Sequence, residues 1–275
     1  MKIAVLIACV LAGGVVASAQ QPQAPPAPPA PPPSAPTGYP DTPMQPNGKW
    51  RIHDGTRPQP RVVTPGPLMS LAPPSDAIVL LGSGQDLGRW QMTQGGGPVS
   101  WPVADGVMSS GKGMIRTTQD DFTDYQLHLE FATPSEVKGN SQGRGNSGVF
   151  LNGVFEIQVL DSFENVTYPD GQASAMYGQF PPMVNASRKP GEWQSYDIVF
   201  TGPRFNGTTL ARPATVTVLH NGVTVHAARA FLGPTGHKQI GTYAPAHAKG
   251  YIGLQDHGNP VRFRNIWVRP LVDAQ

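Results

Sequence analysis

The chain has 275 residues, of which only 14% are charged, while its 32 Gly and 31 Pro make up close to a quarter. This composition is typical of a turn-rich β protein and argues against a mainly helical one. The 20 Lys and Arg nearly balance the 18 Asp and Glu, so the charge gives no support for nucleic-acid binding.

The first 19 residues have the features of a secretory signal peptide. Lys2 precedes an apolar run over residues 3–16, and Ala17-Ser18-Ala19 has the small-x-small pattern of a signal peptidase site. We therefore expect a bacterial protein that is periplasmic or secreted. The single cysteine, Cys9, lies in this segment, so no thiol or disulfide is expected in the mature chain. The sequence after residue 19 contains no run of about 18 apolar residues, so no transmembrane helix is predicted there.

Residues 20–75 are predicted to be a proline-rich linker. Residues 21–36 are almost entirely Ala, Pro and Gln, which cannot bury enough apolar surface to offset the entropy of ordering. We expect a disordered spacer there. From residue 38 the segment gains Trp50, His53 and Arg57, so this part either lies against the following domain or continues as an irregular linker.

Residues 76–272 read as one all-β domain. In 124–131 (DYQLHLEF) apolar and polar residues alternate strictly, as in a strand with one buried face. Asn152-Gly153 and Asn221-Gly222 each separate two apolar segments, which is the strongest short hairpin signal. About ten such strands and no amphipathic helix predict a two-sheet antiparallel jelly-roll sandwich. The long loop over residues 163–191 has the length of a functional loop.

Several predicted strands carry polar residues on one face. For any one of them, a solvated outer surface is an equally good interpretation. As a set they are His, Glu, Gln and Arg near Tyr and Trp, the residue types that bind sugar hydroxyls and ring faces. The members are His128 and Glu130, Glu156 and Gln158, Gln255 and His257, and Arg262 and Arg264. No zinc, phosphate-binding or GxSxG motif is present, and we expect no metal between His220 and His226.

Three stretches together resemble one family: GNSGVFL with FEIQVLDS, then YPDGQASAMYGQFPPMVNASRKPGEWQSYDIVF, then GYIGLQDHGNPVRFRNIWVRPL. The chain is similar, over residues 76–271, to the domain of unknown function 1080, also called the 3-keto-disaccharide hydrolase domain. The resemblance implies a concanavalin A-like fold in an exported bacterial protein. It also implies hydrolysis of glycosides whose sugar is already oxidised to a ketone at carbon 3.

Matching positions and chemistry suggest roles for particular residues. A ketone at carbon 3 acidifies the hydrogen on carbon 2, so the group on carbon 1 can leave by elimination before water adds. We expect Glu156 or His257 as the base, Arg262 or Arg264 beside the enolate, and Glu130 or Asp161 as the acid. Further sugar-binding candidates are Asn146, Gln158, Tyr177, Gln179, Gln255 and His128. No cofactor is predicted, although a divalent cation could replace the arginine.

Two alternatives stay open. In ordinary glycosidase chemistry two carboxylates stand about 5–5.5 Å apart for retention or about 6.5–9.5 Å apart for inversion, and Glu130 and Glu156 are expected on neighbouring strands. The same residues would equally serve a carbohydrate-binding module without catalysis. The oligomeric state and the sugar are not indicated by the sequence.

Overall fold

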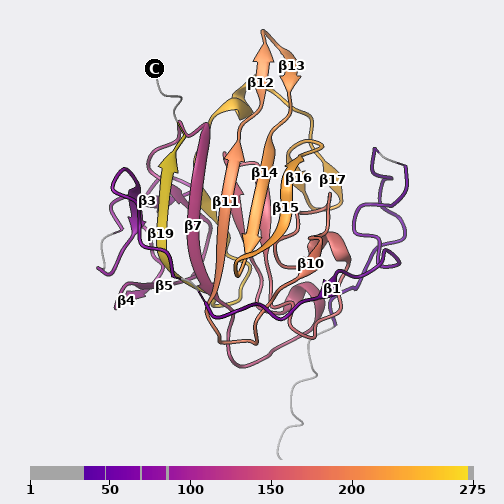
Figure 1. The fold of residues 1–275 in the computed structure, drawn as a ribbon, viewed down its shortest axis with the longest axis horizontal. Coiled ribbons are helices and arrows are strands. Elements are labelled where there is room, and N and C mark those ends of the chain that lie inside the picture. Colours follow the sequence, from indigo (N-terminus) through magenta and orange to yellow (C-terminus); the bar gives the residue numbers. More distant parts are fainter. Residues whose placement is uncertain (1–33, 47, 69, 85–86, 272–275) are drawn as a thin grey trace, which may run out of the picture. The chain divides into compact units, whose positions relative to one another are not determined.

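A computed structural model describes residues 34–46, 48–68, 70–84 and 87–271 (Figure 1). The expected signal peptide and the first part of the expected linker lie outside the described residues. The described residues belong to one compact unit. None of the helices in these ranges is long and apolar enough to cross a membrane.

Short strands form nearly all of the regular structure within the described ranges. The strands are β1 (Arg61–Val62), β2 (Ile78–Leu81), β3 (Trp90–Met92), β4 (Val103–Ala104), β5 (Val107–Ser109), β6 (Ile115–Thr117), β7 (Asp124–Ala132), β8 (Ser147–Leu151), β9 (Phe155–Val159), β10 (Val184–Asn185), β11 (Gln194–Thr201), β12 (Arg204–Asn206), β13 (Thr209–Arg212), β14 (Thr215–His220), β15 (Val223–Ala230), β16 (Thr235–Gly236), β17 (Gln239–Ile240), β18 (Gly253–Leu254) and β19 (Arg262–Pro270). Short 3-10 helices cover Ser141–Gly143, Pro169–Gly171 and Pro245–Ala248.

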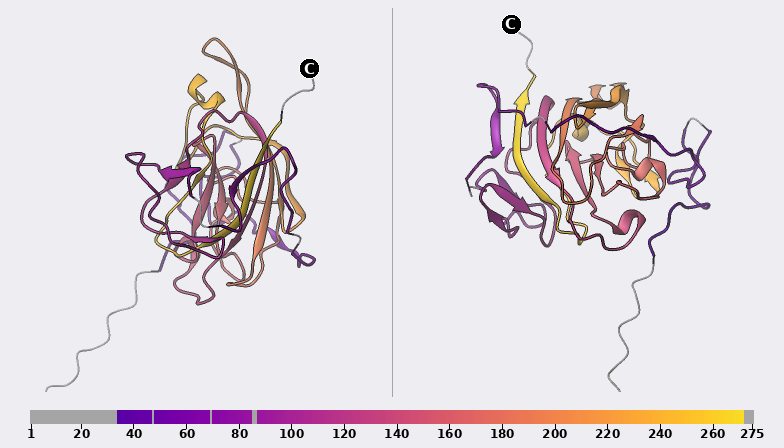
Figure 2. Two further views of the ribbon diagram at one scale, coloured as in Figure 1. Left: turned by 90° about the vertical axis from the view of Figure 1, so that its left-hand side faces the viewer. Right: turned by 60° about the horizontal axis from the view of Figure 1, so that its bottom comes forward.

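Two antiparallel sheets form the body of the protein (Figure 2). The eight-stranded sheet has the order β15-β14-β11-β7-β19-β5-β4, and β2 also pairs with β19. The five-stranded sheet has the order β3-β6-β18-β8-β9. The expected all-β sandwich of the jelly-roll type is therefore confirmed.

The core lies between the two sheets. In β7 the side chains of Tyr125, Leu127, Leu129 and Phe131 are fully or almost fully buried, as the alternation predicted. In β9 the core face is formed by Phe155, Ile157 and Val159, all fully buried. Each large apolar side chain buried in this way contributes about 1.5–3 kcal/mol. The alternate residues of β9, Glu156 and Gln158, consequently point away from the core.

Both predicted Asn-Gly hairpins are present. Asn152 and Gly153 join β8 to β9 with φ values of 46° and 74°, and Asn221 and Gly222 join β14 to β15 with φ values of 54° and 77°. The type I′ turn, whose twist matches that of the flanking strands, requires positive φ at both of its central residues. The first of these hairpins fixes the register of the two strands that carry the cavity described below.

The described part of the upstream segment, residues 34–75, lies against the sandwich. Figure 1 shows the chain around β1 crossing the eight-stranded sheet. There the Leu71 carbonyl accepts hydrogen bonds from Asn265 Nδ2 (3.0 Å) and Trp267 Nε1 (3.1 Å) of β19. Farther upstream, Ile52 and His53 are buried. This part of the expected linker is thus packed, because its few apolar and hydrogen-bonding side chains find partners on the domain.

Candidate functional site

A cavity of about 480 Å³ lies over the outer face of the five-stranded sheet. This volume is in the range of small-molecule sites, about 300–1,000 Å³. Its lining contains two groups of side chains. The polar group consists of Gln142, Asn146, Glu156, Gln158, Gln255 and His257. The second group, the aromatic wall, consists of Tyr39, Tyr168, Tyr177 and His237.

Glu156 is the carboxyl group of this cavity. It points outward from β9, yet the loops above the sheet leave only 5% of it exposed. Burial raises the pKa of the Glu156 carboxyl to about 8, so it holds its proton at neutral pH. The side chain lies across Gly148 of β8, where an added Cβ would come within 2.3 Å of Glu156 Oε1. Glycine at position 148 therefore makes room for the carboxyl.

Amide side chains surround the carboxyl on one side. The Gln158 amide lies between Gln142 Oε1, at 2.8 Å, and Glu156 Oε1, at 3.1 Å. With its nitrogen toward Glu156 it donates to the carboxyl and to the Ser147 carbonyl, and in the opposite orientation it donates to Gln142. Asn146 joins the same group by donating to the Gln142 carbonyl over 2.7 Å. An amide at this place can hydrogen-bond to either protonation state of the carboxyl.

Gln255 and His257 reach the cavity from the segment after β18. The Gln255 backbone is held against β8, since its N–H donates to the Gly148 carbonyl (3.0 Å) and its carbonyl accepts from Ser147 Oγ (2.7 Å). His257 follows in an exposed turn where Asp256 accepts the N–H of Gly258 over 2.8 Å. Exposure leaves the His257 imidazole free to meet a ligand from the solvent side.

A chain of hydrogen bonds runs through the aromatic wall. The hydroxyls of Tyr168 and Tyr177 are 3.0 Å apart, and the Tyr177 hydroxyl is 3.3 Å from His237 Nδ1. Burial raises the pKa of both tyrosines, so the hydroxyls stay protonated. Partial burial, with His53, Lys238 and His257 nearby, lowers the pKa of His237, which favours its neutral form. A neutral imidazole can accept a proton.

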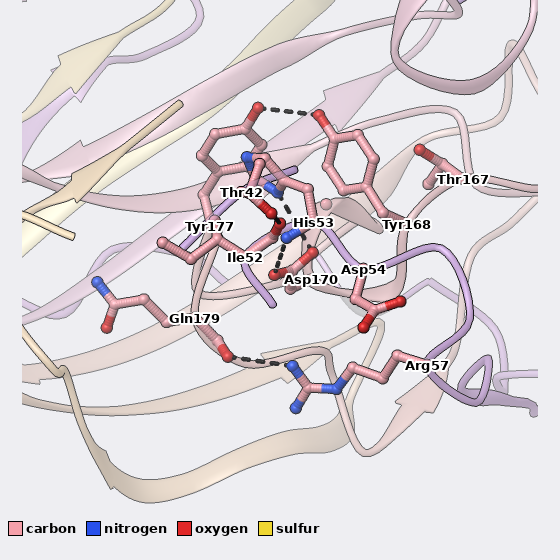
Figure 3. A network of polar contacts seen from close by, with 12 residues as sticks. Thr42, Ile52, His53, Asp54, Arg57, Thr167, Tyr168, Asp170, Tyr177 and Gln179 are labelled. Atoms are coloured by element: carbon pink, nitrogen blue, oxygen red, sulfur yellow. Dashed lines mark hydrogen bonds and ion pairs between the residues drawn. The ribbon is translucent and has the colours of Figure 1, made fainter. Parts of the chain in front are cut away.

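The upstream segment places His53 beside Tyr168 and Tyr177 of the aromatic wall (Figure 3). His53 is fully buried beneath it, with its Nδ1 3.3 Å from Asp170 Oδ1 and its backbone N–H donating to Asp170 Oδ2 over 2.9 Å. Gln45 Nε2 donates to the carbonyls of Gly178 and Gln179 over 3.0 and 2.8 Å. These contacts dock Gln45 and His53 on the loop that carries Tyr168 and Tyr177.

Four predicted site residues lie on the opposite side of the sandwich. His128, Glu130, Arg262 and Arg264 all belong to β7 and β19 of the eight-stranded sheet and point away from the core. Glu130 is fully buried there, and Arg264 Nε donates to its Oε2 over 2.7 Å. Burial opposes ionisation, yet hydrogen bonds from His128, Asn265, Ser70 and Arg264 lower the pKa of Glu130. His128, Glu130 and Arg264 thus belong to one network of polar contacts on this sheet.

This placement corrects two expectations. Glu130 and Glu156 are not on neighbouring strands, because β7 and β9 belong to different sheets. Neither arginine stands beside Glu156, because Arg262 and Arg264 pack on Trp193, with guanidinium carbons 5.2 and 4.1 Å from its ring. The physical reason is that the chain crosses between sheets after β18, so residues close in sequence face opposite sides of the molecule.

Asp161 and Gln179 also lie outside the cavity. Asp161 accepts a hydrogen bond from Arg144 Nε over 2.5 Å and lines a neighbouring smaller cavity. Gln179 is fully buried, donating to the Gly233 carbonyl over 2.7 Å and accepting from the Leu232 N–H over 2.7 Å. Of the twelve predicted residues, the structure brings six into one cavity: Asn146, Glu156, Gln158, Tyr177, Gln255 and His257.

Sequence reasoning missed Gln142, Tyr168, His237 and Tyr39. Gln142 lies in a short 3-10 helix and Tyr168 and His237 lie in loops, where no strand periodicity marks a face. Tyr168 had a weak signal, since it lies in the long loop whose length indicated function. Tyr39 had no signal beyond being an aromatic residue among prolines.

The described residues contain no group of three or more His, Cys, Asp or Glu side chains placed to hold a metal ion. The cavity offers a buried carboxyl, the imidazoles of His237 and His257, several amides and aromatic rings. Carboxyl and imidazole groups transfer protons, amides bind hydroxyl and carbonyl groups, and ring faces stack on sugars. The arrangement is that of a carbohydrate-active site.

The comparisons with known proteins agree with this class. Residues 76–269 match the family described as the 3-keto-alpha-glucoside-1,2-lyase-like domain, and the chain belongs to this family. No curated protein matches the chain.

Three crystal structures of proteins from Parabacteroides distasonis ATCC 8503, each assigned to the glycosyl hydrolases, are similar to this chain. One is 42% identical and covers 86% of this chain and 100% of its own, with a TM-score of 0.67. The other two share only the fold. They are 20% and 23% identical, cover 71% and 70% of this chain and 94% and 98% of their own, and have TM-scores of 0.51 and 0.50.

The match to the first of these structures extends beyond the family domain. Residues 76–275 make up less than three quarters of the chain, so a match over 86% must include part of the segment that precedes residue 76. The upstream segment is thus shared, at least in part, with this relative.

Proposed function

We propose that this protein cleaves 3-keto-glycosides by elimination across carbons 1 and 2 of the oxidised sugar, followed by addition of water. The observation that carries the proposal is the single buried, protonated carboxyl of Glu156. Among the described residues that line the cavity, no second carboxyl accompanies it. Ordinary glycoside hydrolysis uses two carboxyls, whereas elimination needs one base and one proton donor.

The lining residues can be given roles in this reaction. The imidazole of His257 or His237 removes the hydrogen from carbon 2, and the electron pair moves to the carbon 3 oxygen as an enolate. Amide N–H groups of Gln255 and Asn146 lie in the same cavity to hydrogen-bond that oxygen. Expulsion of the carbon 1 substituent then re-forms the ketone, and Glu156 gives the leaving oxygen its proton.

The enone produced in this way accepts water at carbon 1. The water hydroxyl bonds to carbon 1, a proton returns to carbon 2, and the product is the free 3-keto sugar. We further propose that the protein acts after export, as the signal-like residues 1–19 indicate.

The test uses a 3-keto-glucoside and its unoxidised parent, each with a chromogenic aglycone. We expect aglycone release from the 3-keto compound only, with a slower rate when carbon 2 carries deuterium. Equal release from both compounds, without an isotope effect, would point to ordinary hydrolysis. The second candidate, a carbohydrate-binding module, is favoured by the aromatic wall, and binding of both compounds without release from either would support it.

A further inference from the structure

The aromatic wall is assembled from two parts of the chain. Tyr168, Tyr177 and His237 belong to the family domain, whereas Tyr39 lies in the upstream segment, outside residues 76–269. The Tyr39 ring contacts Tyr168 and His237 at centroid distances of 5.9 and 5.6 Å. The ammonium group of Lys238 lies 3.8 Å from the centre of the Tyr39 ring. The ring is thus held from several directions while it still lines the cavity.

His53 supports the wall from behind. Its ring is 4.2 Å from Tyr168, 4.9 Å from Tyr177 and 5.4 Å from His237, measured between centroids. Asp170 fixes the His53 ring and backbone. The upstream segment therefore supports the three rings of the domain through His53 and also supplies a fourth ring, that of Tyr39.

The backbone of the upstream segment is fixed at the cavity edge. Ala35 forms two hydrogen bonds with the Asn140 side chain, each of 2.9 Å, and the Pro36 carbonyl accepts from Ser141 Oγ over 2.6 Å. Gly38 and Gly55 lie so close that a Cβ on Gly38 would be 2.4 Å from the Gly55 Cα. Tyr39 is therefore presented by an ordered stretch of chain.

We propose that Tyr39 and the rest of the aromatic wall bind the aglycone of the substrate, and that the upstream segment selects aglycones with a flat ring face. The polar group, which includes Glu156, Gln255 and His257, binds the sugar that reacts. This assignment of sugar and aglycone to the two groups rests on the proposed function. An aromatic residue presented beside polar groups stacks on the apolar face of a ring. Aglycones without a ring gain nothing from this wall.

Binding and turnover test this separately. Calorimetry compares unoxidised methyl and phenyl α-glucosides, which need no reaction to bind. Stacking is worth about 0.5–1.5 kcal/mol, so we expect the wild-type protein to bind the phenyl glucoside up to about tenfold more tightly. Tyr39→Ala is expected to remove most of this preference, and Tyr39→Phe to keep it. Trp50→Ala, which changes an aromatic residue of the same segment outside the cavity, is the matched control and should keep it as well.

The outcomes separate the two proposals. A preference that is absent from the wild type, or unchanged in Tyr39→Ala, overturns the role of Tyr39 even if 3-keto-glucosides are cleaved. A preference that depends on Tyr39, found together with no cleavage of 3-keto-glucosides, supports the aglycone site and rejects the reaction. With 3-keto derivatives of the same two compounds, Tyr39→Ala should raise KM for the phenyl compound more than it raises KM for the methyl compound.

Discussion

A carboxyl group buried without a cation beside it is costly to keep as an anion, and Glu156 is such a group. Its pKa is raised to about 8 in the folded protein from an ordinary value near 4.5. Because the unfolded chain releases this proton at lower pH, the stability associated with Glu156 is complete below pH 4.5 and is lost as pH rises through about 8. Such a cost is typical of residues that are kept for function.

Glu156→Gln is expected to have opposite effects on activity and stability. Activity should fall by about 100-fold or more, because an amide cannot protonate the leaving group. The free energy of unfolding at pH 7 should rise by about 1–3 kcal/mol, since folding of the variant no longer requires position 156 to bind a proton that the unfolded chain has released. Steady-state kinetics with a 3-keto-glucoside measure the activity, and thermal unfolding measures the stability. A variant that is both active and less stable would refute this role.

The pH profile gives a second measure of the same group. With Glu156 as the acid, wild-type activity should fall as pH rises through about 8. On the acidic side it should fall when the basic imidazole becomes protonated, below pH 6.5 if this is His237, whose pKa is lowered. The residual activity of Glu156→Gln should lack the alkaline limb. Retention of that limb in the variant would assign it to another group.

Gly148 leaves the space that the carboxyl occupies. In Gly148→Ala the new Cβ would meet Glu156 Oε1 at 2.3 Å, so the carboxyl must move. We expect activity to fall by about tenfold or more, since displacement of a proton donor by a fraction of an ångström slows transfer. Steady-state kinetics measure the change. Gly66→Ala is the control, because nothing lies within 4 Å of its added Cβ. Equal activity of the two variants would contradict the packing argument.

At the scale of elements, the alternation of buried and outward side chains within a strand was predictable from the sequence. Which of the two sheets a strand joins was not. The pattern around Glu156 and Gln158 correctly indicated that both point away from the core, because a period of two is a local property of the backbone. The same pattern placed Arg262 and Arg264 on an outer face, but that face belongs to the other sheet. Whether the chain stays in one sheet or crosses to the other depends on tertiary packing, which local periodicity does not report.

The upstream segment illustrates a second limit. Its composition predicted a spacer over residues 21–36 and left open whether the part from residue 38 lies against the domain. Docking instead depends on single pairs such as His53 with Asp170, separated by more than a hundred residues. A pair of this kind leaves no pattern in the sequence around either residue.

Asp170→Asn tests the docking of this element. The substitution keeps the shape of the side chain but weakens hydrogen bonds to the His53 ring and backbone. We expect a loss of about 1.5–3 kcal/mol in the free energy of unfolding, the range for hydrogen bonds to charged groups. Denaturant unfolding measures this loss, and faster proteolysis near residue 53 locates it. Asp54→Asn, in the same segment but only partly buried and with its carboxylate bonded to Thr56 of the same turn, should cost less stability. Equal effects of the two would argue against specific docking.

At the scale of the whole molecule, two buried histidines make the fold sensitive to acid. His220 and His226 are almost fully buried, and burial lowers their pKa to about 3 and about 4. In the unfolded chain both histidines bind a proton below the ordinary histidine pKa of 6.5. In the folded chain they stay neutral until the pH reaches these lower values. Their contribution to stability is therefore present above pH 6.5 and decreases as the pH falls toward about 4 and then about 3.

Each of these histidines should add a slope of about 1.4 kcal/mol per pH unit in the free energy of unfolding between pH 6 and 4. In His226→Gln the slope should decrease by about this amount. Unfolding measured at a series of pH values gives both slopes. The same slope in His226→Gln as in the wild type would show that this histidine is not buried as a neutral group.

The position of Tyr39 outside the family domain bears on how such proteins diversify. The core that stabilises the sandwich lies between the two sheets, whereas part of the cavity wall comes from a separate, preceding piece of chain. Insertions, deletions or exchanges in that piece can reshape the cavity without repacking the core. If the proposed aglycone site is correct, the stretch of gene that sets selectivity can change while the stretch that encodes the sandwich stays constant.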